Sequence, residues 1–287
     1  MRTEGISLII IFHKRMKHLI NTLNGLARGS MLPDEIILIE MDSRKSQLEE
    51  TGLEIKHKLL EVKNKNYLPI AEARNFGVYN SKFNKLAFLD VDCIPSESYI
   101  ESLFKFNFHD DELYMGLPKY LFSEVENFNQ EELDAKSIIH PHRPEHNKVK
   151  IIEDYGMFWS LTFFLTYDTF KKIGGFDNYY KGYGAEDTDF AFKARELNIG
   201  FILTPFTVYH QQHSFCRPPL NSMKSIVRNC NYFYKKWQIW PMANHLEEFA
   251  KRSLILWDEN YTKPIKILRQ PTIKSIEQVT VLDEPFS

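Results

Sequence analysis

Short apolar runs, the first two of them rich in β-branched residues, alternate with longer segments whose apolar positions recur at helical spacing. Buried strands are predicted over residues 6–12, 35–39, 59–62 and 85–89. Between the first two runs, one face of a predicted helix carries Leu19, Leu23 and Leu26, and Pro69 begins another helix over residues 69–78. Strands that alternate with helices are typical of a parallel α/β sheet with right-handed crossovers.

The rest of the chain continues this alternation, with one long interruption. Further elements are predicted as helices over 97–106 and 167–173, a helix from about 186, and strands over 113–117, 157–165, 199–203 and 207–209. Residues 118–150 are polar and irregular, which predicts a loop over a cleft. Beyond Pro219, amphipathic helices are predicted over 223–237 and 246–257, and the residues after Tyr261 are expected to dock loosely.

Polar side chains follow three of the predicted strands at the point where each strand ends. They are Phe12-His13 and Arg15 after the first strand, Glu40 and Asp42 after the second, and Asp90 and Asp92 after the fourth. In open α/β sheets the ligand binds in the crevice outside the carboxyl ends of the strands. A cationic group, a carboxylate and a metal site at this edge would suit a nucleotide diphosphate. The chain has neither a Gly-X-Gly-X-X-Gly motif nor a Walker lysine loop, which disfavours dinucleotide and NTPase functions.

The Asp90-Val91-Asp92 stretch is the first candidate for chemistry. Alternation along a strand would point both carboxylates to one side, where they repel each other unless a cation lies between them. Mg²⁺ and Mn²⁺ prefer such oxygen ligands and often bridge carboxylates to phosphates. The alternative is structural: Asp90 caps the strand and Asp92 begins a solvated turn.

A second acidic stretch, Glu186-Asp187-Thr188-Asp189, follows Gly182-Tyr183-Gly184-Ala185 at the start of a predicted helix. These acids could simply stabilise the helix N-terminus. The two glycines bend the backbone where the carboxylates begin, and a carboxylate held there could act as a general base on a hydroxyl. Further along, His210 and His213 offer nitrogen ligands for a metal.

Two other features allow a functional and a structural interpretation. His140, His142 and His146 lie among prolines, and we interpret them as part of the loop over the cleft rather than as a zinc site, because the spacing fixes no ligand geometry. The basic, aromatic helix over 223–237 could lie on anionic lipid or pack on its own domain, and packing is the preferred interpretation.

Composition narrows the classes of protein. The net charge of −2 provides no electrostatic footprint for nucleic acid. The three cysteines, Cys93, Cys216 and Cys230, are widely spaced and odd in number, which indicates a reducing compartment. No apolar run reaches the length of a membrane span or matches a signal peptide, so a cytoplasmic protein is expected.

Four segments in this order resemble the GT-A glycosyltransferases, most closely the metal-dependent β-1,4-galactosyltransferase type (family 7) and related bacterial family 2 and chondroitin-polymerase-like enzymes. They are IIFHKR (residues 10–15), ARNFG (73–77), DVDCIP (90–95), which includes the Asp-X-Asp (DXD) motif, and the GGF to GYGAED block (174–187). The resemblance implies a GT-A fold, a mixed, mostly parallel sheet flanked by helices. It places a catalytic domain at 1–216, with a nucleotide-binding half at about 1–117 and an acceptor-binding half at about 118–216. A C-terminal helical extension then covers 217–287.

The resemblance also assigns roles to residues. The nucleotide-sugar would be held by Phe12, His13, Arg15, Glu40, Asp42, Arg74, Asp90 and Tyr183. The metal, Mn²⁺ or Mg²⁺, would be bound by Asp92 and His210. The acceptor would be contacted by Glu186, Tyr183 and Trp159. The catalytic carboxylates would be Asp187, as the base on the acceptor hydroxyl, and Glu186.

The implied reaction is metal-dependent and inverting: a sugar of the galactose or N-acetylgalactosamine type passes from a UDP-sugar to a hydroxyl of a glycan or lipid-linked saccharide. Without the Golgi-type anchor and disulfides of family 7, the chain resembles a bacterial cytosolic enzyme of surface polysaccharide synthesis. The sequence departs from family 7 in three places. Tyr183 replaces a tryptophan, Thr188 replaces an acid, and no methionine lies three residues before His210. These departures leave the acceptor and the third metal ligand open, and His213 could replace His210.

Two other functions are compatible with acids at strand ends. A nucleotidyltransferase that makes sugar nucleotides would share the sheet and the metal carboxylates, but it should carry a glycine-rich loop after the first strand, and residues 12–17 contain no glycine. A non-catalytic module that binds sugar or calcium would explain the acids and aromatics but not their convergence at three strand ends and one helix start.

Overall fold

The computed structural model describes residues 2–48, 51–62, 67–141, 146–282 and 284–285. The strands are β1 (Thr3–Phe12), β2 (Glu35–Asp42), β3 (Ile55–Glu61), β4 (Phe83–Asp90), β5 (Cys93–Pro95), β6 (Glu112–Leu121), β7 (Ser137–Ile139), β8 (Lys150–Ile152), β9 (Thr162–Thr166), β10 (Gly200–His210), β11 (Phe215–Cys216) and β12 (Thr280–Val281). The α-helices are α1 (Met16–Ala27), α2 (Ile70–Asn80), α3 (Tyr99–Lys105), α4 (Gln130–Ala135), α5 (Tyr167–Ile173), α6 (Glu186–Glu196), α7 (Met223–Trp237), α8 (Ala243–Lys251) and α9 (Ile273–Gln278). Short 3₁₀ turns cover Tyr155–Met157 and Leu220–Ser222.

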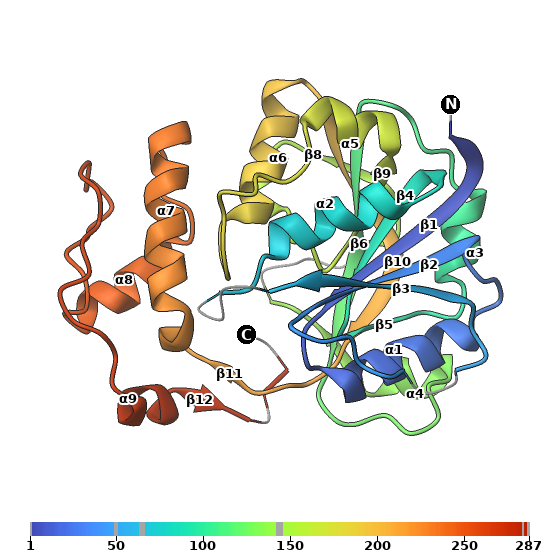
Figure 1. Ribbon diagram of the computed structural model, residues 1–287, viewed down its shortest axis with the longest axis horizontal. Coiled ribbons are helices and arrows are strands. Elements are labelled where there is room, and N and C mark those ends of the chain that lie inside the picture. Colours follow the sequence, from blue (N-terminus) through green and yellow to red (C-terminus); the bar gives the residue numbers. More distant parts are fainter. Residues whose placement is uncertain (1, 49–50, 63–66, 142–145, 283, 286–287) are drawn as a thin grey trace.

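A mixed sheet with the strand order β3-β2-β1-β4-β9-β6-β10-β5 forms the centre of the molecule (Figure 1). The first four strands in this order run parallel, and β6 runs parallel to β10. β9 is antiparallel to both of its neighbours, and β5 is antiparallel to β10. This confirms the mostly parallel α/β architecture, and it brings the ends of β1, β2, β4 and β10 to one region.

Helices cover both faces of this sheet because side chains alternate along each strand. On β1, Ile9 and Ile11 belong to a hydrophobic cluster that includes α2, α5 and α6. Leu8 and Ile10 belong to a second cluster, with α1 and α3. Two clusters on opposite faces explain why the strands read as continuous apolar runs.

The C-terminal extension lies beside the central sheet and has a hydrophobic cluster of its own, formed by α7, α8 and the segment that follows them (Figure 1). Its contact with the rest of the chain centres on Asp189 of α6, which is fully buried. The Asp189 carboxylate accepts hydrogen bonds from Tyr180 Oη (3.1 Å) and Trp237 Nε1 (2.9 Å), and Lys236 Nζ lies 2.5 Å away. Asp189 therefore anchors α7 to α6.

The apolar face of α7 is buried within the protein, as the packing interpretation of this helix expects. Within the described ranges, none of the helices has the length and apolar character needed to cross a membrane. Association of α7 with a lipid surface stays a prediction.

The structure corrects the loop predicted over residues 118–150. β6 continues through Pro118 to Leu121, and α4, β7 and the start of β8 follow within the same stretch. Pro118 is tolerated in the strand because it lies beyond the end of β9 and before β7, where none of the described strands on that side needs its missing N–H. Of the three histidines, His140 and His146 are described, whereas His142 lies outside the described residues.

Three further boundaries differ from the predicted ones. The strand predicted over 157–165 begins only at Thr162, after a 3₁₀ turn and a short connection. The two strands predicted over 199–203 and 207–209 are one strand, β10, with an irregularity between Leu203 and Thr207. The second amphipathic helix ends at Lys251 rather than near Trp257.

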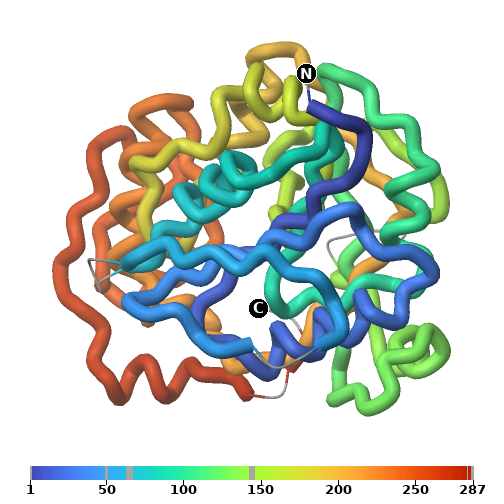
Figure 2. Tube along the Cα trace, turned by 45° about the vertical axis from the view of Figure 1, so that its right-hand side comes forward, coloured from blue at the N-terminus to red at the C-terminus, as the bar shows by residue number. Residues whose placement is uncertain are grey.

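Most of the described residues after Tyr261 are exposed, and the tail is held at a few points. Ile265 is 4% exposed, and its backbone N–H and C=O both bond the side chain of Asn231 on α7. Further on, β12 pairs with β11, so the chain returns to the segment that follows β10 of the central sheet (Figure 2). The pairing places the last described segment beside residues 215–216.

Candidate active site at the strand ends

Three potential metal ligands converge at the ends of β4 and β10. One ligand atom each from Asp92, His210 and His213 lies within 4.8 Å of the others. The Asp92 carboxylate is 3.7 Å from His210 Nε2 and 3.5 Å from His213 Nε2. The sequence predicted Asp92 and His210 as ligands with His213 as an alternative, and the fold brings all three together.

The charges around Asp92 keep it ionised although it is buried. Burial alone would raise the pKa of this carboxyl, but His210, Arg15 and His213 together lower it below the ordinary value. The Arg15 guanidinium contacts the carboxylate directly. An ionised carboxylate is the protonation state that a metal ligand requires.

The imidazoles are also in the form that binds metal. Burial lowers the pKa of His210 to about 4, and burial likewise lowers the pKa of His213, so both rings are neutral near pH 7. His213 Nδ1 is 3.1 Å from the Ser214 carbonyl, which leaves Nε2 as the ligand atom. Among the described residues the buried His210 Nδ1 has no hydrogen-bond partner. These three side chains fit a divalent cation with nitrogen and oxygen ligands.

Arg74 connects this region to the second acidic stretch. It is 4% exposed, and its guanidinium lies 3.6 Å from Asp90 and 3.3 Å from Glu186. It also donates a 2.7 Å hydrogen bond to Ser160 Oγ. Arg74 was predicted to hold the nucleotide, and the structure places it between the predicted donor and acceptor carboxylates.

The two carboxyls that flank Arg74 are strongly affected by their burial. Burial raises the pKa of Asp90 to about 7, against the lowering effect of the Arg74 charge. Burial and the nearby Asp187 raise the pKa of Glu186 to about 7, again opposed by Arg74. Perturbed carboxyls gathered in one region are typical of functional sites.

The backbone before α6 is bent as the glycine pattern predicts. Gly182 and Gly184 have φ values of +72° and +110°, and Ala185 continues at +68°. The bend lets the Gly184 N–H donate to the Glu186 carboxylate (3.1 Å). Next to it, Tyr183 leaves 47% of its surface exposed, as a residue that contacts an acceptor would.

Asp187 lies in the first turn of α6 and is half-buried. One carboxylate oxygen, Oδ1, accepts a 2.8 Å hydrogen bond from the Thr188 N–H. This contact fixes the side chain at the helix N-terminus and matches the structural alternative for these acids. It does not occupy Oδ2, so the geometry is compatible with the predicted role as a base.

The residues at the ends of β1 and β2 that were predicted to bind the nucleotide-sugar make two sets of contacts within the protein. His13 Nδ1 is 3.6 Å from Asp42 and 2.5 Å from the Met41 carbonyl. Glu40 is buried, and its carboxylate bonds His57 Nε2 (2.9 Å) and the Ser46 N–H (2.8 Å). Direct contact of Glu40 with a nucleotide would require one of these partners to give way.

Two aromatic residues of the predicted site differ in accessibility. The Phe12 side chain is 1% exposed, in the core beside His57. Trp159 is half-buried, and its ring contacts His140, which in turn contacts Tyr120 beside His210. Trp159 is therefore linked by ring contacts to the three candidate metal ligands, while Phe12 is available only through its backbone.

Sequence reasoning missed the residues that hold the three candidate metal ligands, Asp92, His210 and His213, in place. Gln211 is buried, its N–H bonds the Asp92 carbonyl (2.7 Å), and its side-chain Oε1 accepts from Asn21 (2.8 Å). From α1, Thr22 Oγ1 donates to the Val91 carbonyl (2.9 Å). The available signal was Thr22, a polar residue on the otherwise apolar inner face of α1.

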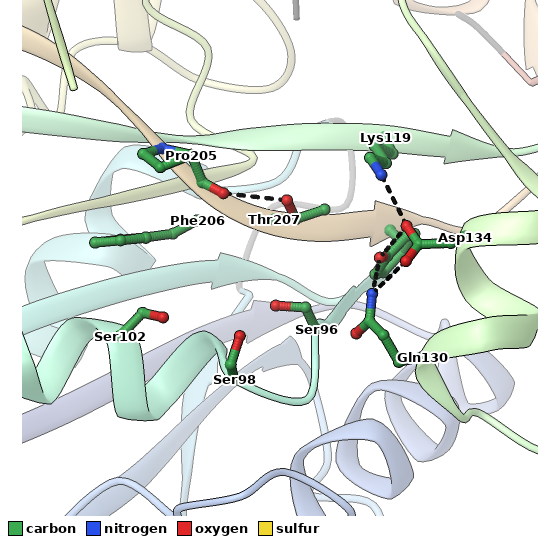
Figure 3. A pocket seen from close by; sticks show the side chains of 10 residues that line it. Ser96, Ser98, Ser102, Lys119, Gln130, Asp134, Pro205, Phe206 and Thr207 are labelled. Carbon is green, nitrogen blue, oxygen red and sulfur yellow. Dashed lines mark hydrogen bonds and ion pairs between the residues drawn. The ribbon is translucent and has the colours of Figure 1, made fainter. Parts of the chain in front are cut away.

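A small polar hollow of about 200 Å³ lies elsewhere, between the β5–α3 connection, β6, α4 and β10 (Figure 3). Lys119 pairs with Asp134 there (2.7 Å). Thr207 and Tyr209 line it from one side of β10, whereas His210, the next residue, faces the metal group on the other side. The hollow is thus separate from the candidate active site.

Comparison with known proteins places this geometry in a family. A model described as "Glycosyl transferase family 2" matches residues 7–169, which is more than half of the chain. The chain belongs to glycosyl transferase family 2. A second model, "N-terminal domain of galactosyltransferase", matches residues 142–215. The chain is accordingly a glycosyltransferase, which disfavours the nucleotidyltransferase and binding-module alternatives.

Two relatives of this family 2 chain are named as a synthase and a glucosyltransferase. Chondroitin synthase of Escherichia coli is 24% identical over 240 residues, covering 73% of this chain and 35% of that protein. Validoxylamine A glucosyltransferase of Streptomyces hygroscopicus subsp. limoneus is 25% identical over 263 residues, covering 80% and 56%. The chain thus spans about a third to just over half of the length of these relatives.

Solved structures confirm the GT-A fold. GalNAc-T7 with UDP, GalNAc and Mn²⁺ superposes with a TM-score of 0.51 at 16% identity, over 72% of this chain and 43% of that chain. TarS of S. aureus superposes with a TM-score of 0.53 at 12% identity, over 88% and 44%. A TarS fragment in complex with UDP-GlcNAc has a TM-score of 0.51 at 14% identity, over 74% and 59%.

Proposed function

We propose that this family 2 enzyme is a metal-dependent, inverting glycosyltransferase that moves a sugar from a UDP-sugar to a hydroxyl of a glycan acceptor. The observation that carries the proposal is the metal-ligand group of Asp92, His210 and His213 at the same sheet edge as Arg74 and the start of α6. Two structural neighbours are titled as complexes with UDP or UDP-GlcNAc, which supports a nucleotide-sugar donor.

Mn²⁺ is the proposed cation, with Mg²⁺ as the weaker candidate, because two imidazoles beside one carboxylate favour a transition metal. Asp92, His210 and His213 would hold it. When bound, the cation supplies positive charge that stabilises the departing diphosphate. The neighbour GalNAc-T7 is titled as a complex with Mn²⁺.

The proposed catalytic base is Asp187. Its carboxylate would accept the proton of the acceptor hydroxyl as that oxygen attacks the anomeric carbon from the face opposite the leaving group, and one such displacement inverts the configuration. Glu186 and Tyr183 would position the acceptor, with Trp159 beside them. Arg74 would hold the carboxyl groups of Asp90 and Glu186 in position.

On the donor side, the uracil and ribose would lie among the predicted residues of the β1, β2 and β4 ends. These are the Phe12 backbone, His13, Arg15, Glu40, Asp42 and Asp90. Residues 1–117 would then form the nucleotide-binding half and 118–216 the acceptor-binding half, with 217–287 as an extension. A galactose or N-acetylgalactosamine donor and a cytoplasmic role in bacterial polysaccharide synthesis complete the proposal.

The test is UDP release from a panel of UDP-sugars with and without Mn²⁺. Wild type should hydrolyse one sugar nucleotide slowly and only with Mn²⁺, and Asp187→Asn should lose this activity. The matched control is Asp168→Asn, an exposed acid at the start of α5, which should behave as wild type. Silence across the panel, together with no stabilisation by UDP and Mn²⁺, would overturn the proposal.

A further inference from the structure

A cavity of about 490 Å³ opens in the C-terminal extension, between the end of α7 and residues 257–262. Its volume falls in the range of roughly 300–1,000 Å³ that is usual for small-ligand sites. It shares no lining residue with the candidate active site. Four aromatic side chains line it, namely Tyr234, Trp240, Trp257 and Tyr261.

The aromatic wall is firmly held. Tyr234 and Trp240 stack with their ring centroids 4.0 Å apart and their planes 14° apart. Trp240 Nε1 donates to the Tyr261 carbonyl, which ties the two sides of the cavity together. Behind them, the side chain of Asn231 bonds both backbone groups of Ile265. Such a wall is preorganised, so a ligand would pay little to order it.

Polar groups complete the lining. Gln238 and Asn260 contribute amides, Thr262 a hydroxyl, and Glu259 a carboxylate. Of the described residues that line the cavity, none is a lysine or an arginine. In the same stretch of chain, the indole Nε1 of Trp257 has no partner among the described residues. Aromatic faces with neutral donors and acceptors match a ligand that has apolar faces and hydroxyl edges.

This chemistry excludes the nucleotide and favours a neutral sugar. A diphosphate or a lipid phosphate would need positive charge, which the lining lacks. The single carboxylate, Glu259, would repel an acidic sugar. A pyranose ring offers C–H faces for the aromatic rings and hydroxyls for the amides, as ligand sites of mixed apolar and polar character require.

The cavity lies close to the segment that carries Tyr183. Met242 stands between Trp240 and Ala243, two lining residues, and a Cβ on Gly184 would lie only 2.7 Å from its sulfur. On the other side, Asn229 of α7 donates to the Gly184 carbonyl (3.0 Å). One layer of side chains thus separates the cavity from the predicted acceptor segment.

We propose that this aromatic cavity binds a neutral sugar residue of the glycan acceptor, remote from the hydroxyl that reacts. The site would hold the acceptor chain while its end reaches Asp187. The assignment of the ligand as acceptor rests on the proposed function. Binding of a neutral saccharide by the cavity does not.

The binding test uses the full chain without donor or metal. Neutral oligosaccharides of glucose, galactose and N-acetylhexosamine are titrated by calorimetry, beside chains in which uronic acids alternate. We expect a neutral oligosaccharide to bind, and Trp257→Ala to weaken it about tenfold or more, as for a tryptophan anchor. Tyr79→Ala, a matched loss of an 83% exposed aromatic on α2, should leave binding unchanged.

Thr262→Val and Asn260→Ala keep the test valid if Trp257→Ala fails to fold, because both side chains line the cavity and are exposed, so their loss should weaken binding without unfolding. In transfer assays, Trp257→Ala should raise KM for an oligosaccharide acceptor but not for a monosaccharide acceptor or the UDP-sugar. Unchanged binding in all three variants, or preference for the acidic chains, would overturn the inference. Cavity-dependent binding without any transfer by wild type would overturn the proposed function and the assignment of the ligand as acceptor, but not the binding of a neutral saccharide by the cavity.

Discussion

Replacement of Arg74 by methionine should destabilise the protein, and the loss should grow with pH. The variant keeps most of the side-chain volume but removes the charge beside Glu186 and Asp90 and the hydrogen bond to Ser160. Removal of one partner from a buried ion pair typically costs about 3–5 kcal/mol, because the other charge is left unpaired.

The pH dependence follows from Glu186. The pKa of Glu186 is about 7 in the folded protein and ordinarily 4.5. Above pH 7 the ionised, buried carboxylate therefore lowers the free energy of unfolding by on the order of 3 kcal/mol. A carboxyl whose folded pKa is raised loses stability as the pH rises from the unfolded to the folded value. In wild type this loss ends near pH 7. Without Arg74 the folded pKa of Glu186 rises further, so the loss continues above pH 7.

The assay is urea unfolding of wild type and Arg74→Met at pH 5.5 and 8.5, followed by tryptophan fluorescence. At pH 5.5 Glu186 is protonated in both folded proteins, and the difference should be small. At pH 8.5 it should approach the full cost of an unpaired buried charge. Adding Glu186→Gln to Arg74→Met should restore much of the stability at pH 8.5. Equal losses at both pH values, or no rescue by the second substitution, would refute the reasoning.

Three further outcomes are expected. Asp187→Asn should lower transfer by about 10²–10⁴-fold, the usual contribution of a general base, with UDP binding retained by calorimetry; wild-type turnover would remove the assignment. Asp92→Ala should abolish the rise in melting temperature that UDP shows with Mn²⁺, and a persistent rise would place the metal elsewhere. Gly184→Ala should cost about 1–2 kcal/mol in unfolding, because φ is +110° and a Cβ would meet Met242; an unchanged urea midpoint would contradict the described bend.

The parts of the fold and site that depend on local pattern could be predicted from the sequence. Strands β1 and β2 follow from β-branched runs and β4 from a short apolar run, and α7 begins and ends where its amphipathic pattern does. Asp92, His210 and His213 were found because each follows a recognisable strand end.

The parts that depend on distant contacts could not be predicted. Arg74 reaches Glu186 across 112 positions of sequence, so its place between two carboxyls has no local signal. Asp189 looked like one of three equivalent acids, yet contacts from α7 make it an anchor. The docking of Ile265 depends on Asn231, a residue that reads as an ordinary polar position on a helix. Pro118 is expected to end a strand by local rules, but β6 continues because, among the described residues, neither β9 nor β7 pairs with it at that point.

The pairing of β11 with β12 fastens the extension at both of its ends. Residues 217–279 form a loop whose first and last segments meet, through the contacts of Phe215 with Val281 and Cys216 with Thr280. A segment closed in this way has fewer conformations than one attached at a single point. This closure limits how far α7 can move from the segment 182–185, and a chain shortened before Thr280 would hold the helix through residue 217 and through side-chain contacts such as that of Trp237 with Asp189. The position of residues 217–279 relative to the central sheet thus depends partly on β12.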